Sequence, residues 1–178
     1  WSYIEGFIAE NNIAVELYAG EGWNKDSNTL KINDDVYDVK ENQWLVEGVI
    51  GAAPSSWELF KKFEEKLIVE ADKRTGLVSV SIEYYSPQIA KQWMDLYVES
   101  INRFMQQRQV NKVTRNIAYL QEQIGKTSIA EMQEVFYSII EEQTKSKMLA
   151  EASPDYVFVA VGPSMVPELK SQPGRALI

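Results

Sequence analysis

The chain has 178 residues, of which 45% are hydrophobic and 25% charged, a composition ordinary for one globular domain with a core. Its net charge of -8 argues against a protein that wraps nucleic acid and against charge-driven docking on anionic lipid. The absence of cysteine and histidine excludes disulfides, thiolate catalysis and His-based triads, so an enzyme would have to use carboxylates, lysine or tyrosine.

Residues 1–54 are expected to form a short helix followed by loops and strands. Apolar residues recur at helical spacing as far as Ile8, beyond which two asparagines interrupt the pattern. Turn-forming residues at 33–35 separate two β-prone segments, 30–32 and 36–39. The sequence therefore predicts a small hairpin in which these two segments pair.

A second helix is expected to start at Ser55, which precedes Glu58 by three residues, the spacing of a capping box. Two strands follow, at 67–71 and 77–84, and Gly76 in the turn between them can adopt a positive φ. Apolar and polar residues alternate in the second strand. This alternation predicts one buried and one solvated face.

The dominant feature is a long helix that begins at Ser86-Pro87, a strong start signal. No glycine or proline follows before Gly125, so the helix should span about 38 residues, or roughly 57 Å. Its first half carries a wide apolar stripe suited to packing on a sheet. Its second half carries apolar residues at the alternating spacings of three and four that coiled coils use.

A turn is expected at Gly125, which suits the residue that follows a helix end. Ser128 and Glu131 repeat the capping-box spacing, so a second helix should return antiparallel to the first and end near Ser153. A continuous helix through Gly125 is the alternative. The residues predicted to form the hairpin or oligomer face are Val110, Val113, Ile117, Leu120, Ile124, Met132 and Phe136.

The remaining segment, 154–178, is expected to start with an apolar strand at 156–161 that joins the strand at 77–84. Three prolines then favour an extended tail. The predicted fold class is α+β. The expected organisation is an α/β base from 1–85 and 154–162, a long helix with its return helix over 86–153, and a Pro-rich tail over 163–178.

Several motifs have a structural explanation rather than a chemical one. The 125–127 segment ends like a phosphate-binding loop, but the required first glycine is replaced by Leu120 in a helix. Acidic pairs at 34–35, 64–65 and 141–142 consist of adjacent residues, which cannot face each other across a cleft. No catalytic residue, cofactor or metal is therefore predicted.

Two features favour contact with partners. Trp23 and Trp44 lie outside clear periodic elements, so they are the aromatic residues best placed to meet a partner or a glycan. A two-helix hairpin leaves one apolar flank poorly covered, and such flanks usually mark an interface. The sequence therefore predicts self-association through the hairpin.

These elements resemble a known protein family from about residue 76 onward. The motifs that carry the resemblance are Gly76-Leu77-Val78, Ser86-Pro87 with Ala90 and Trp93, Tyr119-Leu120 with Gln123, Thr127-Ser128 with Ala130-Glu131, Glu141 to Ala150, Tyr156 with Phe158, and Pro163 with Pro167-Glu168. In this order they are similar to the Wzz family of polysaccharide chain-length determinants, which are polysaccharide co-polymerases.

The resemblance implies a periplasmic domain between two transmembrane helices that lie outside this chain, in the inner membrane of a Gram-negative bacterium. It implies a membrane-proximal base, a helix that projects away from the membrane, and a ring-like homo-oligomer. It also implies non-enzymatic control of the length of O-antigen or a related glycan during lipopolysaccharide biosynthesis, alongside a Wzy-type polymerase and the nascent glycan. The membrane-proximal tail would contain Pro163, Pro167, Pro173 and Arg175.

Two alternatives stay open. The chain could be the periplasmic domain of a tyrosine-autokinase co-polymerase, whose kinase domain would lie outside this sequence. It could also be a generic coiled-coil adaptor with no glycan role.

Overall fold

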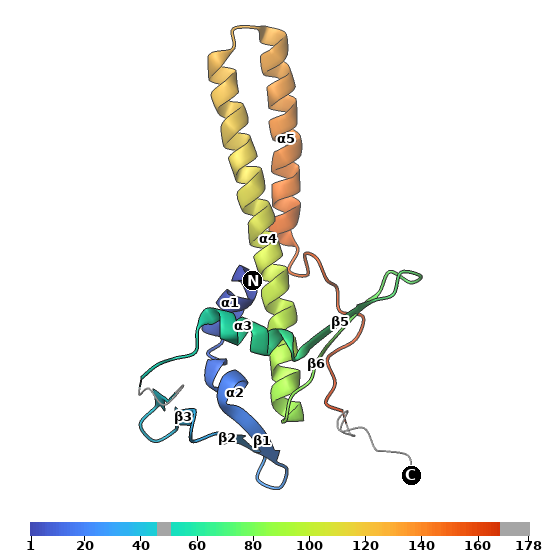
Figure 1. Ribbon diagram of the computed structural model, residues 1–178. Helices are drawn as coiled ribbons and strands as arrows, with labels where there is room; N and C mark the ends of the chain where they lie inside the picture. The colour runs from blue at the N-terminus through green and yellow to red at the C-terminus, as the bar shows by residue number, and fades with distance from the viewer. Residues whose placement is uncertain (46–50, 168–178) are drawn as a thin grey trace. The chain divides into compact units, whose positions relative to one another are not determined.

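The computed structural model describes residues 1–45 and 51–167 and is a mixed α+β structure (Figure 1), as predicted. The chain divides into two compact units. The first contains residues 1–97 and the segment that starts at Pro163, and the second contains residues 98–162. Two of the predicted tail positions, Pro173 and Arg175, lie outside the described residues.

Three short helices shape the first unit: α1 (Ser2–Glu10), α2 (Ala14–Ala19) and α3 (Ser56–Glu64). The predicted capping box at the start of α3 is confirmed. The Ser55 hydroxyl oxygen accepts a hydrogen bond from the Glu58 amide at 3.3 Å, and the Glu58 carboxylate accepts one from the Ser55 amide at 2.7 Å. Two amides that the first helical turn leaves without partners are thereby satisfied.

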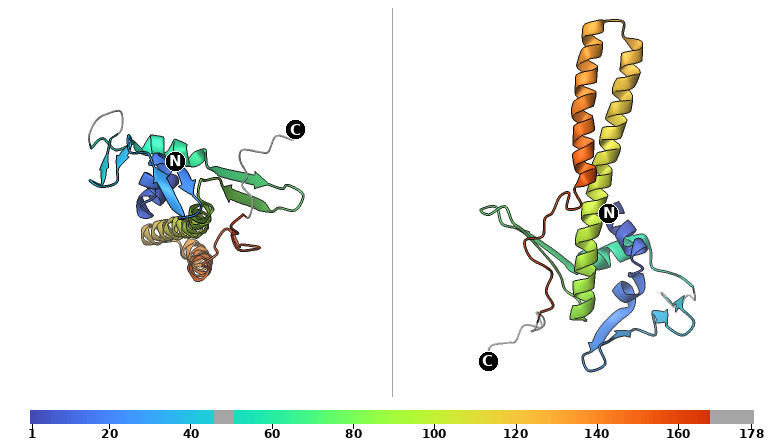
Figure 2. Two further views of the ribbon diagram at one scale, coloured as in Figure 1. Left: turned by 90° about the horizontal axis from the view of Figure 1, so that it is seen from below. Right: turned by 180° about the vertical axis from the view of Figure 1, so that it is seen from behind.

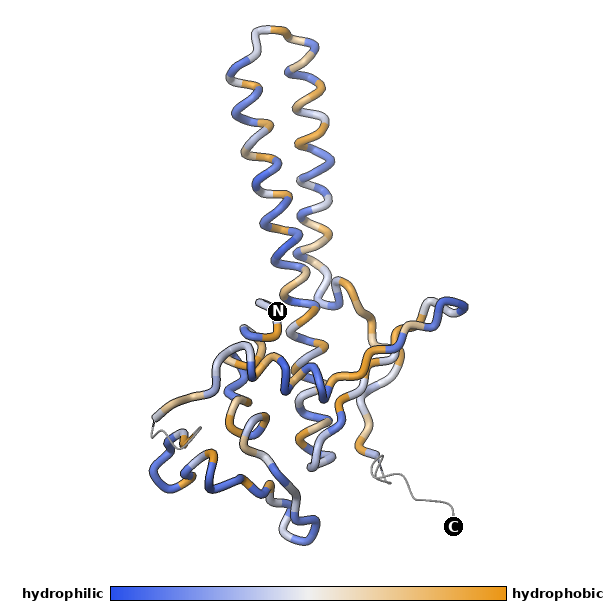
Figure 3. Tube along the Cα trace, viewed as in Figure 1, coloured by the Kyte–Doolittle hydropathy of each residue, from blue (hydrophilic) through white to orange (hydrophobic). Residues whose placement is uncertain are grey.

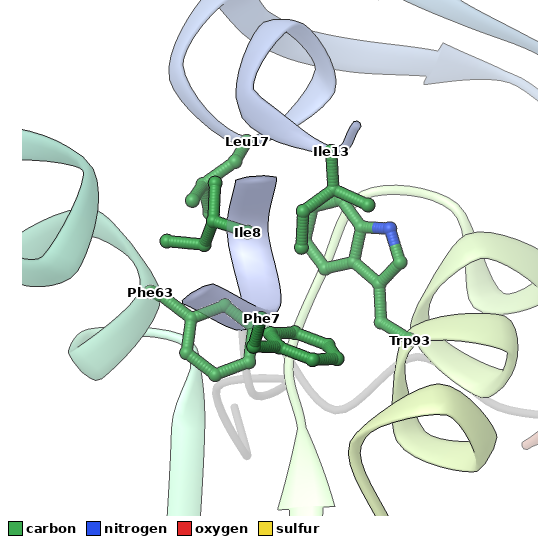
Figure 4. Close-up of a cluster of buried hydrophobic side chains, with 6 residues drawn as sticks. All are labelled: Phe7, Ile8, Ile13, Leu17, Phe63 and Trp93. Carbon is green, nitrogen blue, oxygen red and sulfur yellow. The ribbon is translucent and has the colours of Figure 1, made fainter. Parts of the chain in front are cut away.

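The core of the first unit is a cluster of side chains from all four of its helices (Figure 4). The first half of the long helix α4 (Pro87–Lys126) contributes Trp93, which is 1% exposed. The other members are Phe7, Ile8, Ile13, Leu17 and Phe63. The α4 stripe therefore packs mainly on helices, with only Leu67 and Ile82 of the strands at the margin, and not on a sheet as expected.

A close approach at Gly20 ties the start of β1 (Gly20–Asn24) to this core. The Tyr84 hydroxyl donates a hydrogen bond to the Glu16 carbonyl and lies where a Cβ at position 20 would be. Burial, with a smaller effect from Glu16, raises the pKa of Tyr84 well above its usual range. Tyr84 therefore stays a neutral donor, and only glycine leaves room for it.

The strand pairing predicted between 30–32 and 36–39 is wrong. β2 (Thr29–Ile32) pairs antiparallel with β1, and β3 (Tyr37–Asp38) pairs with β4 (Gln43–Trp44). The reason lies in the preceding turn, where the Asn24 side chain accepts hydrogen bonds from the amides of Asp26 and Ser27. This local side-chain bonding reverses the chain before residue 29, so β2 meets β1 first.

The predicted hairpin of β5 (Leu67–Ala71) and β6 (Val78–Ile82) is confirmed, with Gly76 at φ 73° in its turn. Figure 2 shows both strands extending away from α3. The prediction that one face of β6 is buried is confirmed only in part. Val80 and Ile82 are half-buried, whereas Val78, on the same face and nearer the turn, is exposed.

The second unit contains the rest of α4 and α5 (Ala130–Ala152), which run antiparallel (Figure 1). The long helix and the separate second helix are as predicted, so α4 does not continue through the turn. The predicted Ser128–Glu131 capping box is wrong, because Ile129 is the N-cap and no side chain caps it. Instead the Gln133 side chain donates to the Thr127 carbonyl at 2.9 Å. Gly125 also stays within α4 and is not a left-handed residue after it.

The segment after α5 does not form the strand predicted at 156–161. Instead, backbone groups of this segment form hydrogen bonds with the side chain of Asn102, a buried residue of α4. The Asn102 carbonyl oxygen accepts from the amides of Val157 and Phe158 at 3.0 and 2.9 Å, and its amide donates to the Phe158 carbonyl at 2.9 Å. A segment held this way presents fewer free amides to a sheet edge.

Candidate interaction surface of the helical hairpin

The interior of the hairpin is a narrow apolar seam. The five predicted α4 positions from Val110 to Ile124 are all at least half-buried, and Val113 is 2% exposed. Phe136, also predicted, is half-buried on α5. These positions recur every three or four residues, and Figure 3 shows hydrophobic residues interspersed with hydrophilic ones along both helices. Their spacing and burial indicate that they face the partner helix.

Met132 is placed differently from the other residues predicted on this face. Its side chain is 45% exposed, and the neighbouring Gln133 takes the half-buried position instead. Gln133 contributes hydrogen bonds to the turn, which an apolar side chain could not provide. The sequence pattern favoured the methionine because it counts apolar residues and does not detect this polar clamp.

Hydrogen bonds of two glutamine side chains define the register between α4 and α5. The Gln106 side chain donates to the carbonyls of Ala150 and Ser153 at 2.8 and 3.0 Å. At the other end, Gln133 donates to the carbonyl of Ile124 at 3.4 Å. Counting inward from both contacts places Arg115 of α4 level with Glu141 of α5.

The outer sides of the hairpin expose an unusual amount of apolar surface. Met132, Val135 and Ile139 of α5 are exposed and recur at spacings that keep them on one side of the helix. Tyr119 and Tyr137 are 61% and 59% exposed. Exposed apolar residues that share one side of a helix, as Met132, Val135 and Ile139 do, are typical of a face that meets a partner.

Charge divides unequally between the two helices. From residue 98 onward, α4 carries five basic and two acidic side chains, a net charge of +3, whereas α5 carries two basic and five acidic side chains, a net charge of -3. The ion pairs found within this unit each join residues of a single helix, as Lys145 and Glu141 do at 2.6 Å. Lys145 lowers the pKa of Glu141, first through its hydrogen bond and then through its charge.

Trp23 and Trp44, the two tryptophans singled out by sequence, have local packing partners. The Trp23 ring nitrogen donates to the Asn28 side chain at 3.0 Å, across the turn between β1 and β2. Trp44 packs edge-on against Tyr37, with ring centroids 4.9 Å apart. Both side chains are half-buried.

A more exposed aromatic cluster was missed by the sequence analysis. Trp57 stacks on Phe60 at a centroid distance of 5.4 Å and lies 5.0 Å from Trp1. The Lys61 ammonium lies 5.1 Å from the Trp57 ring. Trp57 and Phe60 recur at the helical spacing that is typical of core residues, yet their contacts with neighbouring rings leave Trp57 54% exposed.

The described residues show no other strong candidate for a site. Two depressions are lined by residues of one hairpin each, β1 with β2 and β5 with β6. Within 1–45 and 51–167, no cluster of acidic side chains is arranged to hold a metal ion, and no helix is long and apolar enough to cross a membrane. In comparisons with known proteins, no family model, curated protein or solved structure matches this chain.

Proposed function

We propose that the chain is the periplasmic part of a non-enzymatic regulator of polysaccharide chain length, similar to the Wzz family, which acts on O-antigen or a related glycan. It works as a homo-oligomer beside the polymerase and the nascent glycan in the inner membrane of a Gram-negative bacterium. In this proposal the first unit corresponds to the membrane-proximal base of the family, and the second unit corresponds to its long helical hairpin. The flanking transmembrane helices lie outside this chain, and the tail leads toward one of them.

The observation that carries the proposal is where the family-like motifs fall on the fold. Ser86-Pro87 begins α4, with the Ser86 hydroxyl accepting a hydrogen bond from the Ile89 amide at 3.3 Å. The Thr127-Ser128 motif forms the turn, and the segment 141–150 forms the last turns of α5. The motifs therefore coincide with the start of α4, the turn after it and the end of α5, which supports a shared order of elements.

The exposed surface of the hairpin supports a role through contacts. Many of its apolar and charged side chains are neither buried nor paired in the seam between α4 and α5. Association would therefore bury apolar surface that a single copy leaves in water. A regulator that acts by assembly needs such a surface and needs no catalytic group. The two-helix seam provides a stiff support for it.

The direct test is genetic. Deleting the gene in its native host and separating lipopolysaccharide on a gel should abolish the preferred chain length, and the wild-type gene should restore it. Val113→Asp should fail to restore it, because it places a carboxylate in the seam. Val161→Asp is the matched control, since Val161 is 86% exposed and should restore the pattern.

An unchanged banding pattern after deletion would contradict the proposal and favour the coiled-coil adaptor. A kinase sequence downstream in the same gene product would favour the autokinase co-polymerase.

A further inference from the structure

A basic stripe runs along the outer side of α4. Arg108, Lys112 and Arg115 follow one another at spacings of four and three, so they share one helix face. Arg115 lies two residues beyond the buried Val113, or about 200° around the helix, so this face points away from α5. All three side chains are exposed, and none has an ion pair within the described part of the chain.

An acidic stripe runs along the outer side of α5. Glu134 lies two residues before the seam residue Phe136, or about 200° around the helix, so it points away from α4. Glu131 and Glu142 lie on the same outer side, together with Lys145, which is paired with Glu141, so the stripe keeps a net negative charge. These three glutamates are exposed, and no ion pair is found for them among residues 1–45 and 51–167.

The two stripes carry opposite charges and lie at the same level along the hairpin axis. The glutamine contacts at the ends of the seam place Arg115 level with the adjacent Glu141 and Glu142. By the same count, Tyr119 is level with Tyr137, and both rings are exposed. Each helix therefore offers a charged side chain and an aromatic ring at the heights where the other does.

We propose that the partner of this surface is a second copy of the chain, which lays the outer side of its α5 against the basic stripe of α4. The two hairpins then run parallel and level, so that Arg115 of one copy meets Glu141 and Glu142 of the next. This inference rests on the proposed homo-oligomer and specifies its interface. It goes beyond that proposal by assigning the two contacting faces and their polarity.

Charge selects this arrangement over the alternatives. Contact between two α4 stripes would oppose like charges, as would contact between two α5 stripes. Contact between α4 of one copy and α5 of the next pairs opposite charges. Because each copy has one basic and one acidic stripe, the same contact can repeat from copy to copy. The repeat either closes into a ring or continues as an open row. The rings of Tyr119 and Tyr137 add an attraction that salt does not screen.

Sedimentation of the whole purified chain tests the interface. K112E/R115E and E134K/E142K should each weaken self-association at least about tenfold, because each replaces attraction by repulsion. An equimolar mixture of the two variants should associate again, since the acidic α4 of one then meets the basic α5 of the other. Raising the salt to about 1 M, where screening acts within about 3 Å, should weaken wild-type association.

Controls separate the interface from stability and from net charge. K25E/K40E changes the net charge as K112E/R115E does, but on loops of the first unit, and should associate like the wild type. Circular dichroism should show unchanged helix content in every variant, because the reversed side chains are exposed and without ion pairs in the described chain.

Three results would overturn the interface. The first is a wild-type chain that stays monomeric at about 1 mM, because its association free energy would then be weaker than about 4 kcal/mol. The others are self-association that neither charge reversal weakens, and a mixture of the two variants that stays dissociated. An oligomer insensitive to reversal leaves the chain-length proposal standing with another contact. A gel pattern unchanged by gene deletion removes that proposal and leaves the charge-reversal result valid.

Discussion

The cluster around Trp93 and the seam around Val113 bury apolar side chains in very different ways. Trp93, Phe7 and Phe63 come from helices far apart in the sequence and are surrounded on several sides. In the hairpin, Val113 is the only large apolar side chain that is fully buried. A thick core stabilises its own unit, whereas a two-helix seam leaves the outer side of each helix in water. The hairpin therefore gains most from a partner.

The largest effect is expected from emptying the thick core. Trp93→Ala should lower the free energy of unfolding by about 3–5 kcal/mol, because it removes buried contacts and leaves a cavity. Urea denaturation followed by circular dichroism measures the loss. Trp57→Ala is the matched control, since Trp57 is exposed, and should cost well under half as much. Equal losses from both variants would contradict the assigned core.

A charge in the thin seam should act locally. Val113→Asp buries a carboxylate without a partner, which should destabilise the hairpin by about 3 kcal/mol. Hydrogen exchange should show lost protection in α5 and in the second half of α4, with amides of α1 and α3 unchanged. Val135→Asp, at a position 56% exposed, should leave protection intact. Loss of protection throughout both units would show that the seam and the core unfold together.

Local signals predicted the helix starts well. Ser55 with Glu58 and Ser86 with Pro87 fixed the starts of α3 and α4, because capping depends on residues within one turn. Gly76 likewise fixed the β5–β6 turn through its own backbone freedom. These features need no knowledge of distant contacts, and the structure has them where the sequence placed them.

Features that depend on competition between partners were not predictable in the same way. The β1 strand has two glycines and little β-propensity, so no pattern marked it as the partner of β2. The apolar run at 156–161 has strong β-propensity, yet Asn102, more than fifty residues earlier, binds its backbone. At the candidate surface, heptad spacing found five α4 residues. It missed the exposed position of Met132 because Gln133 completes the turn.

The polar anchor in the second unit gives a smaller test of the same contrast. Asn102→Leu keeps the size of the side chain but removes three hydrogen bonds to residues 157–158. Unpaired buried groups cost about 1–3 kcal/mol, so the amides of Val157 and Phe158 should exchange at least about tenfold faster. Asn111→Leu, at an exposed position, should leave both rates unchanged. Unchanged exchange in Asn102→Leu would show that the segment is held by other contacts.

The smallest effect concerns the start of α3, the helix that supplies Phe63 to the thick core. Hydrogen bonds from the Ser55 hydroxyl and amide lower the pKa of Glu58 below its usual 4.5. A lowered folded pKa stabilises the native state above the unfolded pKa, and this contribution disappears as the pH falls through the folded pKa. Ser55→Ala should cost about 1 kcal/mol near neutral pH.

That cost should shrink at an acidic pH well below the usual pKa of 4.5, as protonation of Glu58 weakens the capping box in the wild type as well. Denaturation at both pH values measures the change, and an NMR titration should show the pKa of Glu58 moving up toward its usual value in Ser55→Ala. Ser56→Ala is the matched control: the neighbouring hydroxyl takes no part in the box, so both the stability difference and the Glu58 titration should stay close to wild type. A cost for Ser55→Ala that does not depend on pH would mean that α3 is held by its packing on the core alone, with the box contributing nothing through Glu58.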